Sequence, residues 1–182
     1  KFNISGLTVT YGDTVVILKN QTVACDKDPI FVISGKSITI DFNGYVVTAD
    51  IVGSGNAIRT IFQTEADAKL TVTDSTNGNG GVVVHGEGIT HYMFRNYGEM
   101  DIAGGKFVLA ALNGGAMFFS NNSNMVVNGG TFFQYTSGWM FNTYDNGLYQ
   151  ITVNGGTFNR YFIGGEDVIP EENLKGEVVI KD

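Results

Sequence analysis

The chain has 182 residues, a formal net charge of −7 and 43% apolar side chains, enough for one domain with a continuous core. It contains no cluster of Lys or Arg, which argues against nucleic acid or an anionic membrane as a partner, and no apolar stretch long enough to span a bilayer. Its 25 glycines and only two prolines predict an ordered chain with many tight bends.

Short segments in which apolar and polar residues alternate predict β-strands along the whole chain, and no segment has a convincing helical period. The expected strands cover residues 14–18, 30–33, 37–41, 70–73, 81–84 and 177–180. A polar loop over residues 74–80 and several Asn-Gly pairs separate them, and both Asn and Gly tolerate the positive φ of a sharp corner. The chain is therefore predicted to be all-β.

A repeat of about 25 residues is marked by Gly-Gly pairs that begin at residues 80, 104, 129 and 155. The segments MVVNGGTF (125–132) and ITVNGGTF (151–158) are nearly identical. A period of this length indicates one supersecondary unit stacked on itself, so that like residues lie above one another.

Stacking of this kind gives three local expectations. Phe107, Phe132 and Phe158 should form an aromatic ladder inside the protein. Asn128 and Asn154 should form an amide ladder at a corner. At least one glycine of each of the pairs 129–130 and 155–156 should have positive φ, because the chain turns sharply there.

The segments SITIDFNGYVVT (37–48) and AKLTVTDS (68–75), followed by the repeated NGGTF, resemble the right-handed parallel β-helix proteins of the pectin-lyase-like superfamily. That group includes bacterial surface proteins, phage tailspikes and secreted polysaccharide enzymes. The resemblance covers about residues 30–160 and implies a single-stranded right-handed parallel β-helix, or β-solenoid, of about seven rungs. We expect one domain over residues 1–182, with an irregular N-terminal rung or cap (1–24), regular rungs (25–165) and a C-terminal loop and last strand (166–182).

A second repeated mark is a Met-Phe pair at residues 93–94, 117–118 and 140–141, with a decayed Phe-Ile copy at 162–163. Alternate residues of a strand face opposite sides, so we expect only one of the two apolar sets to face the interior. Met93, Met117, Met140 and Phe162 are the candidate outward set. A soluble monomer rarely leaves such a stripe bare, so it is expected to be covered by a loop or to form a homo-oligomer interface, with a trimer favoured.

Aromatic side chains are concentrated between residues 135 and 149. An aromatic face stacks on a sugar ring, and nearby Asn and Asp side chains supply hydrogen bonds. Tyr135, Trp139, Tyr144 and Tyr149 are therefore candidate glycan-binding residues. The alternative is that about half of the aromatic residues in this segment belong to the core ladder.

No residue set predicts a catalytic centre, a metal site or a cofactor. The resemblance implies that a hydrolase of this fold would have clustered Asp residues with Gly-His-Gly, which the segment 85–88 (HGEG) matches only in part. A lyase would need calcium-binding acids with an Arg or Lys base, but Arg59, Arg95 and Arg160 lie in different rungs. Asp74 and Asp101 are the nearest pair of stacked carboxylates, and solvated acids at turns are the favoured interpretation. Cys25 and the two histidines have no partners at disulfide or metal-ligand spacing.

The leading hypothesis is a non-enzymatic structural and adhesive module of an extracellular or virion assembly. A capsid decoration, a fibre or tailspike shaft and a bacterial surface adhesin all fit, at a cell surface or on a virion. The expected partners are other copies of the chain, neighbouring structural subunits and surface polysaccharide. The alternative is a carbohydrate-active enzyme (polysaccharide lyase or glycoside hydrolase) or a fragment of one, and the scattered acids favour the first hypothesis.

Overall fold

The computed structural model describes residues 2–3, 9–10, 13–26, 29–53, 58–76, 78–86, 92–110, 117–135, 138–143, 150–160 and 174–181. All regular structure in these ranges is β-strand, as the sequence predicts. The strands are β1 (Phe2–Asn3), β2 (Val9–Thr10), β3 (Thr14–Ile17), β4 (Gln21–Cys25), β5 (Phe31–Ile33), β6 (Ser37–Asp41), β7 (Val46–Ile51), β8 (Thr60–Thr64), β9 (Lys69–Thr73), β10 (Gly81–His85), β11 (Tyr92–Asn96), β12 (Glu99–Ile102), β13 (Lys106–Leu109), β14 (Met117–Asn121), β15 (Asn124–Val127), β16 (Thr131–Gln134), β17 (Phe141–Thr143), β18 (Gln150–Arg160) and β19 (Leu174–Lys181).

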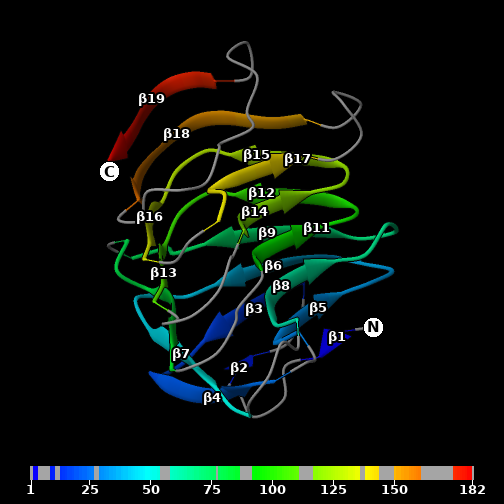
Figure 1. The fold of residues 1–182 in the computed structure, drawn as a ribbon. Coiled ribbons are helices and arrows are strands. Elements are labelled where there is room, and N and C mark those ends of the chain that lie inside the picture. Colours follow the sequence, from blue (N-terminus) through cyan, green and yellow to red (C-terminus); the bar gives the residue numbers. More distant parts are fainter. Residues whose placement is uncertain are drawn as a thin grey trace.

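Most strands pair in parallel and stack into three ladders (Figure 1). The first ladder contains β5, β8, β11, β14 and β17. The second contains β3, β6, β9, β12, β15 and the first part of β18, and the third contains β4, β7, β10, β13, β16 and the last part of β18. The second and third ladders belong to one sheet because β18 runs through both. From β5 onward, successive strands join the three ladders in the same order, which fits a β-solenoid.

The two ends of the stack differ. At the first end, β1 pairs with β5 and β2 pairs with β3, and both pairings are antiparallel. At the other end, β19 pairs in parallel with β18 (Figure 1). A two-residue antiparallel strand is a poor template for further pairing, so β1 and β2 blunt the first edge of the first and second ladders. The third ladder ends there in the five-residue strand β4.

The second ladder illustrates why the sequence forms these strands. Burial alternates along β6, β9, β12 and β15, and the outward residues between the buried ones are mostly polar. The inward residues are Ile38, Ile40, Leu70, Val72, Met100, Ile102, Met125 and Val127. Full burial of each such side chain stabilises the fold by about 1.5–3 kcal/mol. A slip of one residue would turn this whole set outward, so burial fixes the register.

Two columns of phenylalanine rings fill the interior. The predicted ladder of Phe107, Phe132 and Phe158 is confirmed, with stacked rings whose centroids are 5.6 and 5.0 Å apart. A second column on the first ladder consists of Phe31, Phe62, Phe94, Phe119 and Phe141, with centroids 4.7, 4.9, 5.3 and 5.1 Å apart. The columns meet edge to face, as in the contact of Phe119 with Phe132 at 5.0 Å and 70°. Such aromatic pairs add about 0.5–1.5 kcal/mol each beyond their buried area.

The Met-Phe pairs do not form an outward stripe. The strand register pairs Phe94 with Phe119, so the alignment of Met93 with Met117 expected from the sequence is wrong by one residue. Met93, Phe118 and Met140 are fully buried. The Phe118 ring lies 5.2 Å from Phe119 and 5.7 Å from Phe132, so both neighbouring residues face the interior.

Strict alternation fails at this place because these residues lie at the beginning of strands of the first ladder. Met93 and Phe118 are each the second residue of their strand, and Met140 directly precedes β17. Two consecutive inward side chains at that corner fill the space next to the phenylalanine column. The side chain of Met117 and all of Phe162 lie outside the described residues.

The glycine corners agree with the expectation from the repeat. Gly105, Gly130 and Gly156, each the second of its pair, have φ values of +114°, +112° and +125°. The corner amide ladder is also confirmed, because Asn154 Nδ2 donates to Asn128 Oδ1 at 2.7 Å. It extends by one repeat, since Asn128 Nδ2 donates to Asp101 Oδ1 at 2.8 Å.

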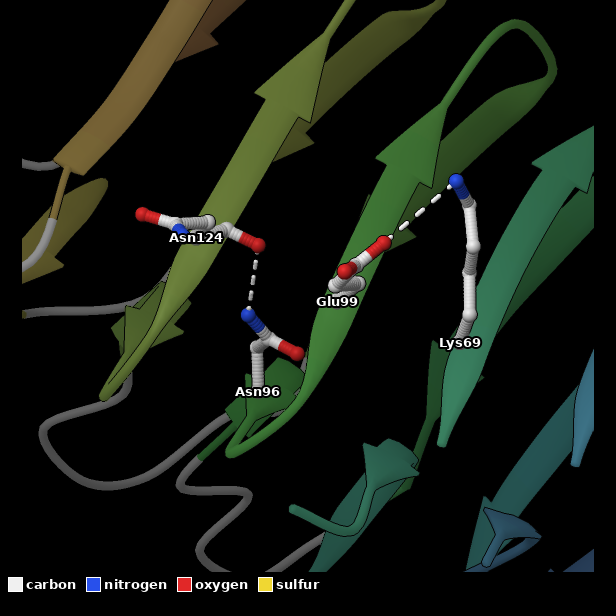
Figure 2. A network of polar contacts seen from close by, with 4 residues as sticks. All are labelled: Lys69, Asn96, Glu99 and Asn124. Carbon is white, nitrogen blue, oxygen red and sulfur yellow. Dashed lines mark hydrogen bonds and ion pairs between the residues drawn. The ribbon is translucent and has the colours of Figure 1, made fainter. Parts of the chain in front are cut away.

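A second, fully buried amide ladder lies at the turn from the first ladder to the second. Asn96 Nδ2 donates to Asn121 Oδ1 and to the carbonyl of Asn124, both at 2.9 Å. Figure 2 shows the bond to Asn124. Asn121 Nδ2 donates in turn to the carbonyls of Ser123 and Gln150. These bonds tie the ends of β11 and β14 to the following strands, and the sequence analysis did not identify them.

Asp74 organises the polar loop after β9. Its carboxylate accepts the backbone N–H of Gly44 at 2.6 Å, the N–H of Gly80 at 2.9 Å and the hydroxyl of Thr76 at 3.0 Å. Burial acts to raise the pKa of Asp74, but the hydrogen bonds from Gly80, Gly44 and Thr76 outweigh it and lower the pKa below the ordinary value of 3.8.

This lowered pKa predicts an acid-sensitive contribution to stability. A carboxyl whose pKa is lower in the folded state stabilises the fold above its unfolded pKa, and this stabilisation is lost as the pH falls through the folded pKa. In the Asp74→Asn variant this contribution is absent. Urea unfolding of both proteins from pH 7 downward should therefore show a stability difference that shrinks below about pH 3.8. A difference independent of pH would contradict this role of Asp74.

Candidate functional site

The outward face of the second ladder presents two columns of side chains across successive strands. Strand register aligns Ser37, Lys69, Glu99, Asn124 and Gln150 in one column. It aligns Thr39, Thr71, Asp101, Val126 and Thr152 in the other. All but one of these ten side chains are polar, so the face offers hydroxyl, amide and charged groups at the strand spacing of about 4.8 Å.

Two cavities lie along this face and share Lys69. The larger, of about 580 Å³, is lined by Asp13, Thr14, Lys36, Ser37, Ile38, Thr39, Lys69 and Thr71. The smaller, of about 130 Å³, is lined by Lys69, Glu99, Met100, Asp101, Asn124 and Val126. We call the two cavities together the trough. It crosses β6, β9, β12 and β15, and Figure 2 shows Lys69, Glu99 and Asn124 on three successive strands.

Charge is distributed unevenly along the trough. Lys36 and Lys69 line the larger cavity together with Asp13, whereas Glu99 and Asp101 line the smaller one. Lys69 Nζ lies 3.4 Å from Glu99 Oε2, where the two parts meet. Both side chains of this ion pair are at least half exposed, so it contributes little to stability and can exchange with a ligand.

The trough places two carboxylates on one side of a single strand. Glu99 and Asp101 are two residues apart on β12 and line the same cavity. The two carboxylates considered from the sequence have different partners. Asp74 accepts the backbone N–H groups of Gly44 and Gly80, whereas Asp101 lines the smaller cavity and accepts a hydrogen bond from Asn128. Alternating polar residues in consecutive strands were the signal for the trough, since Ser37-x-Thr39, Lys69-x-Thr71 and Glu99-x-Asp101 occur at equivalent places.

The aromatic candidates lie on a different part of the surface. Tyr135, directly after β16 in the third ladder, is 48% exposed, and Trp139, before β17, is 38% exposed. Neither lines the trough. Phe133 is half-buried on the same strand, and Lys106 Nζ lies 5.5 Å from its ring centroid. Tyr144 and Tyr149 lie outside the described residues.

Each of the three arginine side chains contacts other parts of the protein. Arg59 is buried and its Nη2 donates to the carbonyl of Val52 at 2.8 Å. Arg160 is also buried, and its Nη2 donates to the carbonyl of Gly138 at 2.6 Å. The Arg95 guanidinium lies 4.7 Å from the ring of Tyr92 and 5.0 Å from that of Tyr97. None of the three lines the trough.

The remaining reactive groups are dispersed. Burial raises the pKa of the Cys25 thiol to about 11, although Arg59 nearby acts to lower it, so the thiol stays protonated at neutral pH. His85 Nδ1 lies 3.5 Å from Asp50 Oδ1 on the exposed side of the third ladder. Within the described ranges, no group of three or more His, Cys, Asp or Glu side chains could hold a metal ion, and no helix is long and apolar enough to cross a membrane.

Two surfaces thus carry the candidate binding chemistry, namely the trough and the exposed aromatic residues Tyr135 and Trp139. Both are presented by backbone that is held in register by the ladders. Comparisons of the chain with protein-family models, with curated proteins and with solved structures found no match.

Proposed function

We propose that the chain is a right-handed parallel β-helix of the kind found in the pectin-lyase-like superfamily, and that it serves as a non-enzymatic structural and adhesive module that contacts glycans. The stacked parallel ladders and the repeated glycine corners support the β-helix. A solenoid of this type is a rigid surface on which side chains recur at a fixed spacing. The proposed setting is an extracellular, cell-surface or virion assembly.

The trough is the observation that carries the proposal. Ligand cavities typically have volumes of about 300–1,000 Å³, and the larger cavity of about 580 Å³ lies within that range. Such cavities are usually lined by apolar side chains, whereas this one is lined mainly by hydroxyl and charged groups. A polar lining suits a ligand with many hydroxyl groups, such as a carbohydrate chain.

The exposed aromatic residues provide a second contact and a direct test. Affinity gel electrophoresis against a panel of polysaccharides should show retardation of the wild-type protein. Tyr135→Ala and Trp139→Ala should each weaken binding by about fivefold, because a stacking contact contributes about 1 kcal/mol. Tyr45→Ala is the matched control, since Tyr45 is exposed in the turn before β7 and lies outside both surfaces. Equal binding by all three variants would contradict an aromatic contact.

The alternative function is carbohydrate cleavage, and the position of Glu99 and Asp101 favours it over other enzymatic functions. Glycoside hydrolysis requires two carboxylates about 5–10 Å apart, and the Cα atoms of residues two apart on one strand are separated by about 7 Å. The same polysaccharide panel distinguishes the two functions. The adhesive module binds without release of reducing ends, whereas an enzyme releases them and loses this activity in Glu99→Gln or Asp101→Asn.

We also propose that the module assembles with other copies of itself, most simply as a trimer. Met93 and Met140 are buried and do not supply the contact surface. A different outward apolar column on the third ladder consists of the half-buried residues Val83, Val108 and Phe133. Three apolar side chains on neighbouring strands suit a subunit contact. Light scattering at micromolar concentration measures the assembly state, and a monomer would contradict this part of the proposal.

A further inference from the structure

We propose that the larger cavity of the trough binds an anionic group of its ligand, a carboxylate, sulfate or phosphate, through Lys36 and Lys69. This inference rests on the proposed function and specifies the ligand class. The favoured ligand is a hydroxyl-rich chain that carries acidic groups, and an uncharged chain binds less tightly.

Lys36 directly precedes β6, and Lys69 is the first residue of the adjacent strand β9. The backbone N–H of Lys69 donates to the carbonyl of Lys36 at 2.9 Å, so the two residues are neighbours across the strand spacing. Both side chains line the same cavity. Within the described residues, Lys36 has no ion-pair partner, and Lys69 has only the exposed contact with Glu99. Two like charges at one cavity repel each other, and a bound anion relieves the repulsion.

The rest of the lining complements these charges. Thr14, Ser37, Thr39 and Thr71 supply hydroxyl donors, and Asp13 is the acidic residue among the lining side chains. The lining residues therefore have a formal charge of +1, from two lysines and one aspartate and without Glu99 beside Lys69, on a chain whose net charge is −7. A local positive site on an acidic protein concentrates anions at that site. The volume of about 580 Å³ leaves room for an organic ligand that carries the anionic group.

Glu99 limits where the anionic group can bind. Its carboxylate competes for Lys69 at 3.4 Å and, with Asp101, makes the smaller cavity unfavourable for a second anion. Replacement of Glu99 by Gln should therefore release Lys69 and strengthen the binding of an acidic ligand. A trough that selected cations would respond in the opposite direction.

Isothermal titration calorimetry with three probes tests the inference. The probes are polygalacturonate, dextran sulfate and uncharged dextran, which separate carboxylate, sulfate and neutral chains. The wild-type protein should bind at least one acidic probe about tenfold more tightly than dextran. The double variant Lys36→Gln, Lys69→Gln should lose about tenfold or more in affinity for that probe, as expected when charge-assisted hydrogen bonds are removed. Glu99→Gln should bind the same probe severalfold more tightly.

The double variant Lys19→Gln, Lys106→Gln is the matched control. It removes the same two charges from exposed lysines that do not line the trough, so its affinity should stay within about twofold of wild type. The double variant Lys36→Arg, Lys69→Arg keeps the charges and should keep the preference, which separates loss of charge from a local folding defect.

The inference is overturned if the control double variant loses as much affinity as the trough variant, because attraction would then be non-specific. Weaker binding by Glu99→Gln also overturns it. Tight binding of dextran that is unaffected by the lysine substitutions would leave the proposed glycan contact intact and remove only the anionic preference. Absence of binding to every probe would overturn both.

Discussion

Gly81→Ala is expected to destabilise the protein by at least about 3 kcal/mol, because a methyl group at this position has no space. Gly81 is the first residue of β10 and is paired with Lys106 of the next repeat. An added Cβ would overlap the carbonyl oxygen of Lys106 and would lie 2.8 Å from its carbonyl carbon and 2.9 Å from its nitrogen. These are backbone atoms within the third ladder, so the strands must separate to accommodate the change.

Gly104→Ala is the control for this prediction. Gly104 belongs to the next Gly-Gly pair along the chain, which is offset by one residue from the pair 80–81 in the strand register, and the closest atoms to its added Cβ lie at 3.7 and 3.9 Å. Alanine fits there and lowers the entropy of the unfolded chain, so stability should be unchanged or rise by up to about 1 kcal/mol. Urea unfolding of both variants measures the difference. Equal free energies of unfolding would show that β10 and β13 are not in contact as described.

Asn121→Ala should cost about 3 kcal/mol or more, because four hydrogen bonds in a fully buried position are lost. The side chain donates to the carbonyls of Ser123 and Gln150 and accepts from Asn96 Nδ2 and the Ser123 N–H. Alanine leaves these buried groups without their partner. The cost of an unsatisfied buried group is larger than the net gain of an ordinary hydrogen bond.

Asn154→Ala provides the comparison. Asn154 is exposed in the other amide ladder and donates to Asn128 Oδ1 at 2.7 Å. Water can replace this bond, so the loss should be below about 1 kcal/mol. Both asparagines lie in ladders that link successive repeats, and burial is the main difference between them. Thermal or urea unfolding that gave the same loss for both variants would contradict this reasoning.

Much of the fold could be predicted where like residues recur at an even spacing. Phe107, Phe132 and Phe158 each follow a Gly-Gly pair at the same place in the repeat. Their stacking could therefore be predicted from the sequence. The other phenylalanine column could not be predicted from the sequence, because its members, from Phe31 to Phe141, are separated by 31, 32, 25 and 22 residues. The number of residues between successive members therefore varies, and this hides the register.

The candidate site was harder to predict from the sequence than the fold, for a different reason. Exposure of Tyr135 and Trp139 is confirmed, but a role in binding stays a prediction. The trough is built from residue types that do not recur, since Lys69, Glu99 and Asn124 occupy one column. The alternation of polar residues in each strand marks the outward face, but only the pairing of strands shows which of these residues lie together. The buried pair Asn96 and Asn121 was missed because asparagine before a turn ordinarily indicates an exposed corner.

The parallel ladders also determine how the protein responds to mechanical load. Backbone hydrogen bonds between repeats run along the stacking direction, and β1 and β19 lie at opposite ends of it (Figure 1). Tension between the two ends therefore acts on the outermost strands first and detaches the repeats one after another. A repeat of 25 residues, the distance from Phe107 to its partner Phe132, extends to about 80–90 Å when pulled straight. A module anchored at one end and loaded at the other would lengthen in steps of about that size, so that a sudden pull is absorbed before the attachment breaks.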